Sequence, residues 1–200
     1  NQNLNQEESI NMENKNEYSE NDNNNTLNTK DESETELNNL FFRLKNSENV
    51  FEAKIIEKKI WTYWISSSLN KDNNLKMSRG IRLLNDGYLN DALNVFLELC
   101  KVEPKWAEPF NKVATIKFIQ RDYQSSINYI KLTLKKERRH FGAISGLAQI
   151  NLRLGRFENA LRNINQALKI HPFIGIRKVK PFLLEKLKKK EIKIHLNFIN

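Results

Sequence analysis

A pattern that recurs every 34 residues constrains the fold of this chain more than any other feature. Aligning "GYLNDALNVF" with "GRFENALRNI" places Ala92 over Ala160, 68 residues apart, and Ser126 stands at the midpoint. Three more columns agree in side-chain size: Gly80, Ala114 and Ala148; Leu89, Tyr123 and Phe157; Phe96, Ile130 and Ile164. A period of this length is typical of two-helix units that stack into a solenoid.

The repeat predicts three units, residues 73–106, 107–140 and 141–174, each made of two helices. Small residues at unit positions 8 and 20 allow the two helices to approach closely, and large residues at positions 17 and 24 fill the space between units. Pro104 and Pro172 end the second helices of the first and third units, while Arg138 replaces Pro in the second. The predicted fold class is an all-α, right-handed helical-repeat solenoid.

The segments on either side of the repeats have different compositions. Residues 1–32 are rich in Asn and acidic residues, and we expect them to be disordered because they offer little apolar surface to bury. Residues 33–70 are predicted to form an N-terminal helical hairpin, with an apolar stripe that includes Trp61 and Trp64 and a helix start at Asn49 and Glu52. Residues 175–200 are predicted to form a basic helix that caps the solenoid.

This pattern resembles the tetratricopeptide repeat (TPR) family, whose units have a small residue at positions 8 and 20 and Pro at position 32. The stretch from Leu37 to Pro172 also resembles small TPR proteins of alphaproteobacterial type and their organellar relatives. The words that carry this resemblance are "LFFRLKNSE", "KKIWTYW", "PKWAEPFNKVAT" and "RRHFGAISGLAQINLRLGRFENAL". It suggests an organelle of bacterial origin, a mitochondrion or plastid, with the cytoplasm as the alternative, and it implies no defined activity.

The family resemblance implies a concave groove lined by the first helix of each unit, in which a partner protein is held. The groove residues mapped onto this chain are Met77, Asn111, Thr115, Phe118, Gly142, Ser145, Gly146, Gln149 and Arg153. Their mixture of apolar, amide and basic groups suits an extended peptide or a helix of weakly acidic character. The expected function is therefore a non-enzymatic protein–protein scaffold or adaptor.

One well-known TPR function, capture of an acidic chaperone tail by a carboxylate clamp, does not fit the sequence. The clamp needs Lys and Arg at positions 2 and 6 of the third unit, where this chain has Gly142 and Gly146. The first unit has Met77 and Ile81 where Lys and Asn are needed, and the second has Lys112 in place of Asn. We therefore expect no chaperone binding of this clamp type.

Gly142 and Gly146 lie one turn apart inside a predicted helix. Each costs roughly 0.5–1 kcal/mol of stability relative to Ala in such a position. Either the two glycines leave the groove floor bare for a partner's side chain or backbone, or another helix of this chain packs closely there. The sequence leaves both interpretations open.

The charge is unevenly distributed. Residues 1–70 carry 7 Lys and Arg against 13 Asp and Glu, whereas residues 71–200 carry 26 against 11. Two clusters are candidates for anion or RNA contact, although each also fits a solvated surface: Lys135, Lys136, Arg138 and Arg139, and Lys186, Lys188, Lys189 and Lys190. The alternative function is therefore an RNA-associated helical-repeat protein, such as an accessory factor of an organellar ribosome or of RNA processing.

The chemistry-bearing residues do not form a recognisable catalytic pattern. His140, His171 and His195 are far apart, no carboxylate pair stands beside His140 or His171, and we expect each histidine to be a solvated turn residue. Cys100 is the only cysteine, which excludes an internal disulfide and a Cys-rich zinc site. The sequence predicts no enzyme, no cofactor and no metal, and no apolar run approaches the ~18 residues of a membrane span.

Overall fold

The structure, a computed structural model, describes the backbone of residues 34–199 and the side chains of residues 34–192. The chain divides into two compact units, Asn1–Phe42 and Arg43–Asn200. In the first unit, residues 34–42 are helical, as the spacing of Leu37, Leu40 and Phe41 predicts. The disorder predicted for residues 1–32 lies outside the described residues, and the pairing of the N-terminal helices as a hairpin stays a prediction.

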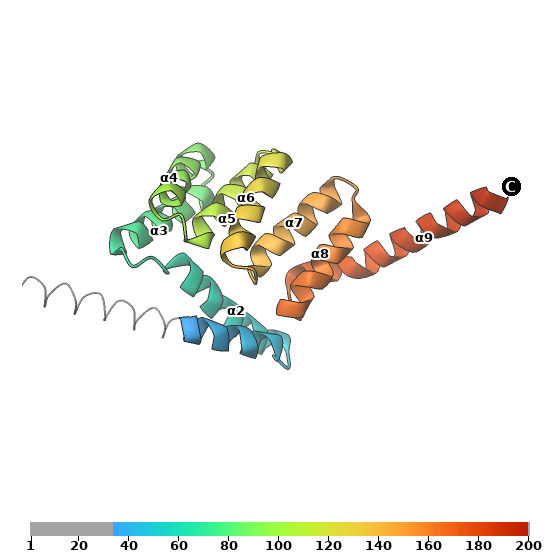
Figure 1. The fold of residues 1–200 in the computed structure, drawn as a ribbon, viewed down its shortest axis with the longest axis horizontal. Coiled ribbons are helices and arrows are strands. Elements are labelled where there is room, and N and C mark those ends of the chain that lie inside the picture. The colour runs from blue at the N-terminus through green and yellow to red at the C-terminus, as the bar shows by residue number, and fades with distance from the viewer. Residues whose placement is uncertain (1–33, 200) are drawn as a thin grey trace, which may run out of the picture. The chain divides into compact units, whose positions relative to one another are not determined.

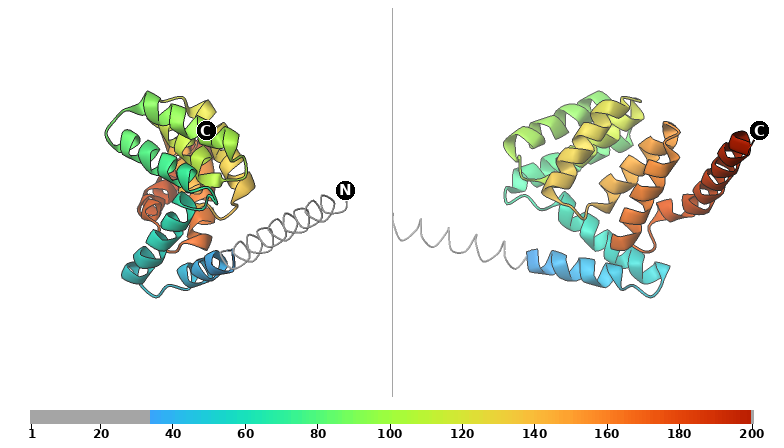
Figure 2. Two further views of the ribbon diagram at one scale, coloured as in Figure 1. Left: turned by 90° about the vertical axis from the view of Figure 1, so that its left-hand side faces the viewer. Right: turned by 45° about the vertical axis from the view of Figure 1, so that its right-hand side comes forward.

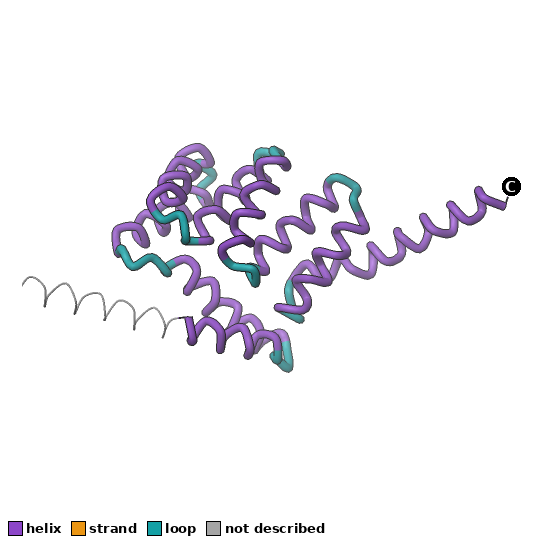
Figure 3. The backbone as a smooth tube through the Cα atoms, in the orientation of Figure 1, coloured by secondary structure: helices purple, strands orange, loops and turns teal. Residues whose placement is uncertain are grey.

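The second unit contains three pairs of helices in the order that the repeat predicts. They are α3 (Lys71–Asn85) with α4 (Leu89–Val102), α5 (Ala107–Ile119) with α6 (Tyr123–Lys136), and α7 (Phe141–Arg153) with α8 (Phe157–Ile170). Each helix packs on the other member of its pair, and α4 also packs on α5 and α6 on α7, so the pairs stack in series (Figures 1 and 2). Residues 34–199 contain helices and no strand (Figure 3), and the all-α helical-repeat prediction is confirmed.

The repeated columns do the packing that their side-chain sizes predict. The Ser126 hydroxyl donates a hydrogen bond of 2.8 Å to the carbonyl of Ala114, so the two small columns meet where helices α5 and α6 approach each other. At Gly80, an added Cβ would lie 2.7 Å from the Phe96 ring, which leaves no room for a larger residue. Phe96 is buried in a cluster that includes Val113 of the next unit, and Ile130 in a cluster that includes Ala143 of the next unit.

The turn inside each pair uses a left-handed residue at the same repeat position. Gly87 has φ of 86°, Arg121 has φ of 61° and Gly155 has φ of 67°. A side chain in this region costs about 1–2 kcal/mol, whereas glycine adopts it without steric strain. The second repeat therefore has a strained turn in which Arg stands where the other two repeats have Gly.

Replacing Arg121 by Gly should raise the free energy of unfolding by about 0.5–1 kcal/mol, because strain relief exceeds the extra chain entropy that glycine loses on folding. Guanidinium unfolding curves measure the difference. Arg156→Gly is the control, because Arg156 has an ordinary φ of −86°. A less stable Arg121→Gly protein would contradict the expectation.

Two helices flank the repeats within the second unit. α2 (Val50–Ile65) starts at Asn49, whose side chain accepts the Glu52 amide at 2.9 Å, as the sequence predicts. After α8, a short 3-10 helix, η1 (Gly175–Val179), leads into α9 (Lys180–Ile199). α9 packs on α8 through the buried Leu183, and Lys190 pairs with Glu158 of α8 at 2.7 Å.

Candidate functional site

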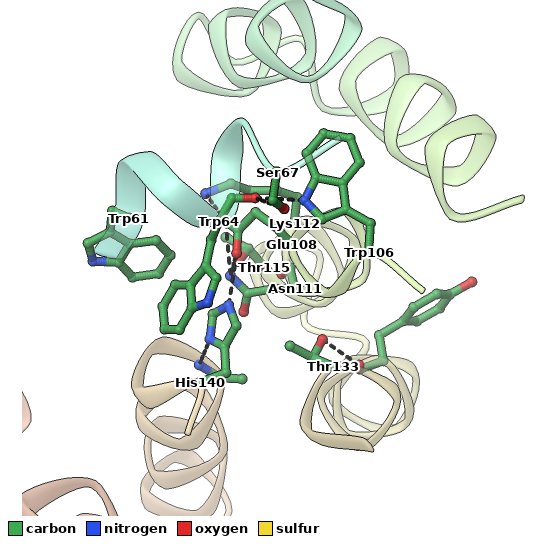
Figure 4. Close-up of polar contacts among 12 residues, drawn as sticks. Trp61, Trp64, Ser67, Trp106, Glu108, Asn111, Lys112, Thr115, Thr133 and His140 are labelled. Carbon is green, nitrogen blue, oxygen red and sulfur yellow. Dashed lines mark hydrogen bonds and ion pairs between the residues drawn. The ribbon is translucent and has the colours of Figure 1, made fainter. Parts of the chain in front are cut away.

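Helix α2 crosses the three turns that end the repeats, and this crossing organises the site. The Trp106 indole N–H donates to the Trp64 carbonyl at 2.6 Å, and the Trp64 ring stacks on His140 with centroids 4.0 Å apart and an interplanar angle of 7° (Figure 4). Further along α2, the Glu57 carboxylate lies 3.2 Å from His171 Nε2. We call Glu57, Trp61 and Trp64 the α2 clasp, because they bind the ends of all three repeats.

A fully buried carboxylate, Glu108, lies under the clasp. One oxygen is 2.8 Å from His140 Nε2 and the other is 2.9 Å from Lys112 Nζ (Figure 4). His140 Nδ1 accepts a hydrogen bond of 3.1 Å from the backbone N–H of Ala143. Nε2 is therefore the protonated nitrogen of the ring, and it donates a hydrogen bond to Glu108. Burial by itself raises the pKa of Glu108, but the hydrogen bond from His140 and the charge of Lys112 outweigh it and hold the pKa below its usual value.

The prediction that His140 and His171 are solvated is wrong. Both rings are buried, at 0% and 1% exposure, and each meets a glutamate. The carboxylates come from 32 and 114 residues away in the chain, so no local pattern could indicate them. Nδ1 of His140 caps α7 while Nε2 binds Glu108, so both of its nitrogens have structural roles. The side chain of His195 lies outside the described residues.

Beside the clasp lies a pocket of about 480 Å³. Four parts of the chain line it: Glu57 and Trp61 of α2; Asn111, Lys112 and Thr115 of α5; Phe141, Gly142, Ser145 and Gln149 of α7; and Ile174, Gly175, Ile176 and Val179. Five of the nine groove residues expected from the sequence thus meet in one pocket, although they come from two different repeats.

The other four expected groove residues lie elsewhere, and the structure corrects the placement of Met77. Met77 is fully buried and packs in a core cluster with Phe96, because its helix turns this apolar side chain inward. Phe118 packs on Tyr123, with ring centroids 5.8 Å apart. Gly146 faces Ile130 of α6, and Arg153 is exposed at the end of α7, outside the pocket lining.

The two glycines of α7 have different surroundings. A Cβ added to Gly142 would lie 2.5 Å from Cη2 of Trp61, so this glycine admits a ring of the α2 clasp. A Cβ added to Gly146 would meet only Ile130 Cδ1, at an ordinary 3.5 Å. The interpretation that another helix of this chain packs closely therefore fits Gly142, and neither interpretation accounts for Gly146.

Gly142→Ala should lower the free energy of unfolding by about 1–3 kcal/mol, because the methyl group overpacks against Trp61. Gly146→Ala should leave stability unchanged or raise it by up to ~1 kcal/mol, because Ala is the better helix former and has room. Thermal and denaturant melts of the two variants give the comparison. Equal melts for both variants would show that Trp61 yields its position at little cost.

Sequence reasoning missed the pocket walls that come from outside the repeats. Glu57, Trp61, Gly175, Ile176 and Val179 carry no repeat position, so mapping family groove positions could not find them. The sequence did contain a signal for the clasp. Trp61 and Trp64 stand on a helix outside the repeats, and Gly142 stands inside α7, where the helix itself does not need a glycine.

Two residues of the basic cluster near the end of α6 contact other side chains of the fold. Lys136 lies over the Phe110 ring at 4.3 Å, and Arg139 bonds to Glu137 at 3.0 Å. Lys135 and Arg138 are exposed and, together with Lys131 and Leu134, line a shallow hollow of about 540 Å³. In this hollow, Lys135 and Arg138 of the first cluster are exposed to anions.

The C-terminal basic cluster also has partners within the fold. Lys189 pairs with Glu185 at 2.6 Å and Lys190 with Glu158 at 2.7 Å, while Lys186 lies 5.7 Å from the Phe182 ring centroid. Lys188 is exposed. These contacts attach basic side chains of α9 to nearby groups and lower the charge that this cluster offers to an anion.

Other chemistry is limited in the described part of the chain. Cys100 packs against the core cluster that contains Met77 and Phe96, and burial raises the pKa of its thiol to about 12, so it is not a thiolate at neutral pH. Among the described residues, no three His, Cys, Asp or Glu side chains are grouped to hold a metal ion. None of the described helices is long and apolar enough to cross a bilayer.

Comparison with known proteins gives one curated relative and several solved structures. A TPR repeat-containing protein of Rhizobium etli is 31% identical over 136 residues, which cover 68% of this chain and 66% of the relative, just under two thirds of its length. No model of a known protein family matches the chain.

Two solved structures share the fold. The first TPR of Spaghetti (RPAP3), bound to the HSP90 peptide SRMEEVD, gives a TM-score of 0.55 at 14% identity over 58% of this chain and 93% of that one. A MamA double mutant gives 0.52 at 16% identity over 82% and 91%. The 34-residue columns, the stacked helix pairs and the Rhizobium relative agree: the chain belongs to the tetratricopeptide repeat family.

Proposed function

We propose that this chain is a non-enzymatic scaffold that holds a segment of a partner protein in the pocket between α5 and α7. The observation that carries the proposal is that five groove residues expected from the sequence, from two repeats, line one pocket of about 480 Å³. A concave site with apolar walls and a few polar groups is typical of ligand-binding surfaces. In the solved RPAP3 structure, a fold of the same kind is bound to a peptide, which supports a peptide ligand here.

The environment of the reactive side chains supports a non-enzymatic role. His140 and His171 are buried and bonded to glutamates, and Cys100 has a raised pKa. Gly142 and Gly146 stand where a carboxylate clamp needs cations, so we propose a ligand other than an acidic chaperone tail.

Affinity purification of the full chain from cells, with and without nuclease, tests the scaffold proposal. The expected result is a set of proteins that stays bound after nuclease treatment and is lost with Thr115→Trp, which fills the pocket. Thr62→Trp is a matched control: both threonines are exposed, and each donates a 3.0 Å hydrogen bond to the carbonyl four residues earlier, but Thr62 lies outside the pocket lining. Partners that persist with Thr115→Trp would contradict the proposed site.

The α6 hollow keeps the RNA-associated alternative open, because three exposed cations line it: Lys131, Lys135 and Arg138. If RNA binds there, its affinity should fall steeply with salt, since each phosphate contact releases counterions. Changing the three residues to Gln should reduce the slope of log affinity against log salt by about 0.7 for each lost contact with a single strand. Absence of binding to an oligouridine at low salt would end this alternative.

A further inference from the structure

The pocket between α5 and α7 is lined by two chemical kinds of side chain. The apolar ones are Trp61, Phe141, Ile174, Ile176 and Val179, and the hydroxyl and amide ones are Asn111, Thr115, Ser145 and Gln149. An occupant that satisfies both kinds must present an apolar group and a hydrogen-bonding group close together.

The two charged residues in the pocket lining are already paired within the chain. Lys112 lies 2.9 Å from Glu108, and Glu57 lies 3.2 Å from His171. A charged ligand group would have to compete with these contacts for Lys112 or Glu57. The pocket therefore favours an uncharged group over an acidic or basic one.

The Ser145 hydroxyl indicates where the hydrogen-bonding group of the occupant lies. Its oxygen is buried and has no hydrogen-bond partner among the described residues, although Ser145 belongs to the pocket lining. A buried polar group without a partner is rare in proteins and costs free energy, so a ligand that supplies the missing partner gains affinity.

Helix α2 limits how a partner segment can lie. The Trp61 ring covers the Gly142 face of α7, and Ile174, Gly175, Ile176 and Val179 line the pocket at the end of the last repeat. An α-helix is about 10–12 Å across with its side chains, so a helix would have to displace Trp61 to lie against the Gly142 face of α7. An extended segment can insert one side chain and bring its backbone to the polar side chains of the lining without displacing Trp61.

We propose that the pocket takes one large uncharged side chain, of the Leu, Ile, Met or Phe kind, from an extended segment of the partner, and that a backbone polar group beside that side chain hydrogen-bonds to Ser145. This inference rests on the proposed function, because it names the part of the partner that the scaffold holds. It departs from the weakly acidic peptide that the groove composition suggests.

A library of random twelve-residue peptides, displayed on phage and selected on the full chain, tests the inference. The selected peptides should share one large apolar position, and its replacement by Ala in the synthetic peptide should weaken binding about 10- to 100-fold. Ser145→Ala should weaken binding about two- to ten-fold without lowering the melting temperature. Thr115→Trp should abolish binding and Thr62→Trp should leave it unchanged.

The outcomes separate the inference from the proposed function. Selected peptides that bind through an acidic or basic residue, or that bind the Thr115→Trp protein as well as the unchanged chain, would overturn the inference while a protein-binding role stands. A library that yields no binder, together with no nuclease-resistant partner in the affinity purification, would overturn both.

Discussion

Replacing Glu108 by Ala is expected to lower the free energy of unfolding by about 3–5 kcal/mol, the range for removing one partner of a buried ion pair. Glu108 is fully buried and accepts hydrogen bonds from both His140 and Lys112. Without it, the His140 N–H and a mostly buried ammonium group lose their acceptor in a region from which water is largely excluded. Urea unfolding followed by circular dichroism measures the loss.

Glu98→Ala is a matched control, because Glu98 also pairs with a lysine, Lys76, but both side chains are about half exposed, at 52% and 44%. An exposed pair contributes only about 0–1 kcal/mol. A Glu108→Ala protein no less stable than Glu98→Ala would show that the buried network adds nothing to folding.

The same carboxylate should give a pH signature. Because its pKa is lower in the folded state than in the unfolded chain, Glu108 contributes stability above the usual glutamate range and loses that contribution as the pH falls through its lowered pKa. Glu108→Gln lacks this titration. The stability difference between the unchanged chain and Glu108→Gln should therefore stay constant near neutral pH and narrow in acid. A difference that widens in acid would contradict the direction of the pKa shift.

The second large effect is expected at the α2 clasp. Trp64→Ala should cost about 3–5 kcal/mol, since it removes a large buried ring and leaves a cavity. The ring is only 3% exposed and lies 5.0 Å from the Phe141 ring in addition to stacking on His140. Differential scanning calorimetry gives the loss as a lower melting temperature.

Phe51→Ala tests whether removing any aromatic residue of α2 lowers the stability as much as Trp64→Ala does. Phe51 lies on the same helix but is 77% exposed, so its removal should change stability by no more than about 0.5 kcal/mol. If the two variants melt alike, α2 does not clasp the repeats in solution.

The repeats were predictable because the units of this one chain can be aligned with one another. Each unit must pack against a copy of itself, so the small side chains of Ala114 and Ser126 and the large side chain of Ile130 recur in register. Asn111, Thr115, Gly142, Ser145 and Gln149 could be named because the family resemblance implies groove positions, and the 34-residue period carries each position from one first helix to the next.

The clasp and the buried histidines were not predictable in this way. Trp64 meets His140, and Glu57 meets His171, across large separations in sequence, and neither α2 residue has an equivalent in another unit. Their contacts depend on how a helix outside the repeats lies across them, which the periodicity does not encode. Met77 was misplaced for a related reason: a family position indicates the face of a helix, and the neighbouring helices of this chain decide whether that face is buried.

The crossing of α2 over the repeat ends has a consequence for how the chain folds and unfolds. In a simple solenoid each repeat contacts only its neighbours, so end repeats can fray independently and folding can spread from any unit. Here the Glu57–His171 contact joins residues 114 apart. It closes a long loop, which a stack of repeats with contacts only between neighbours does not have. Loops of this length form late and slow folding. We expect the amide hydrogens of α7 and α8 to exchange together with those of α5, as one cooperative block, and to exchange separately once Trp64 is removed.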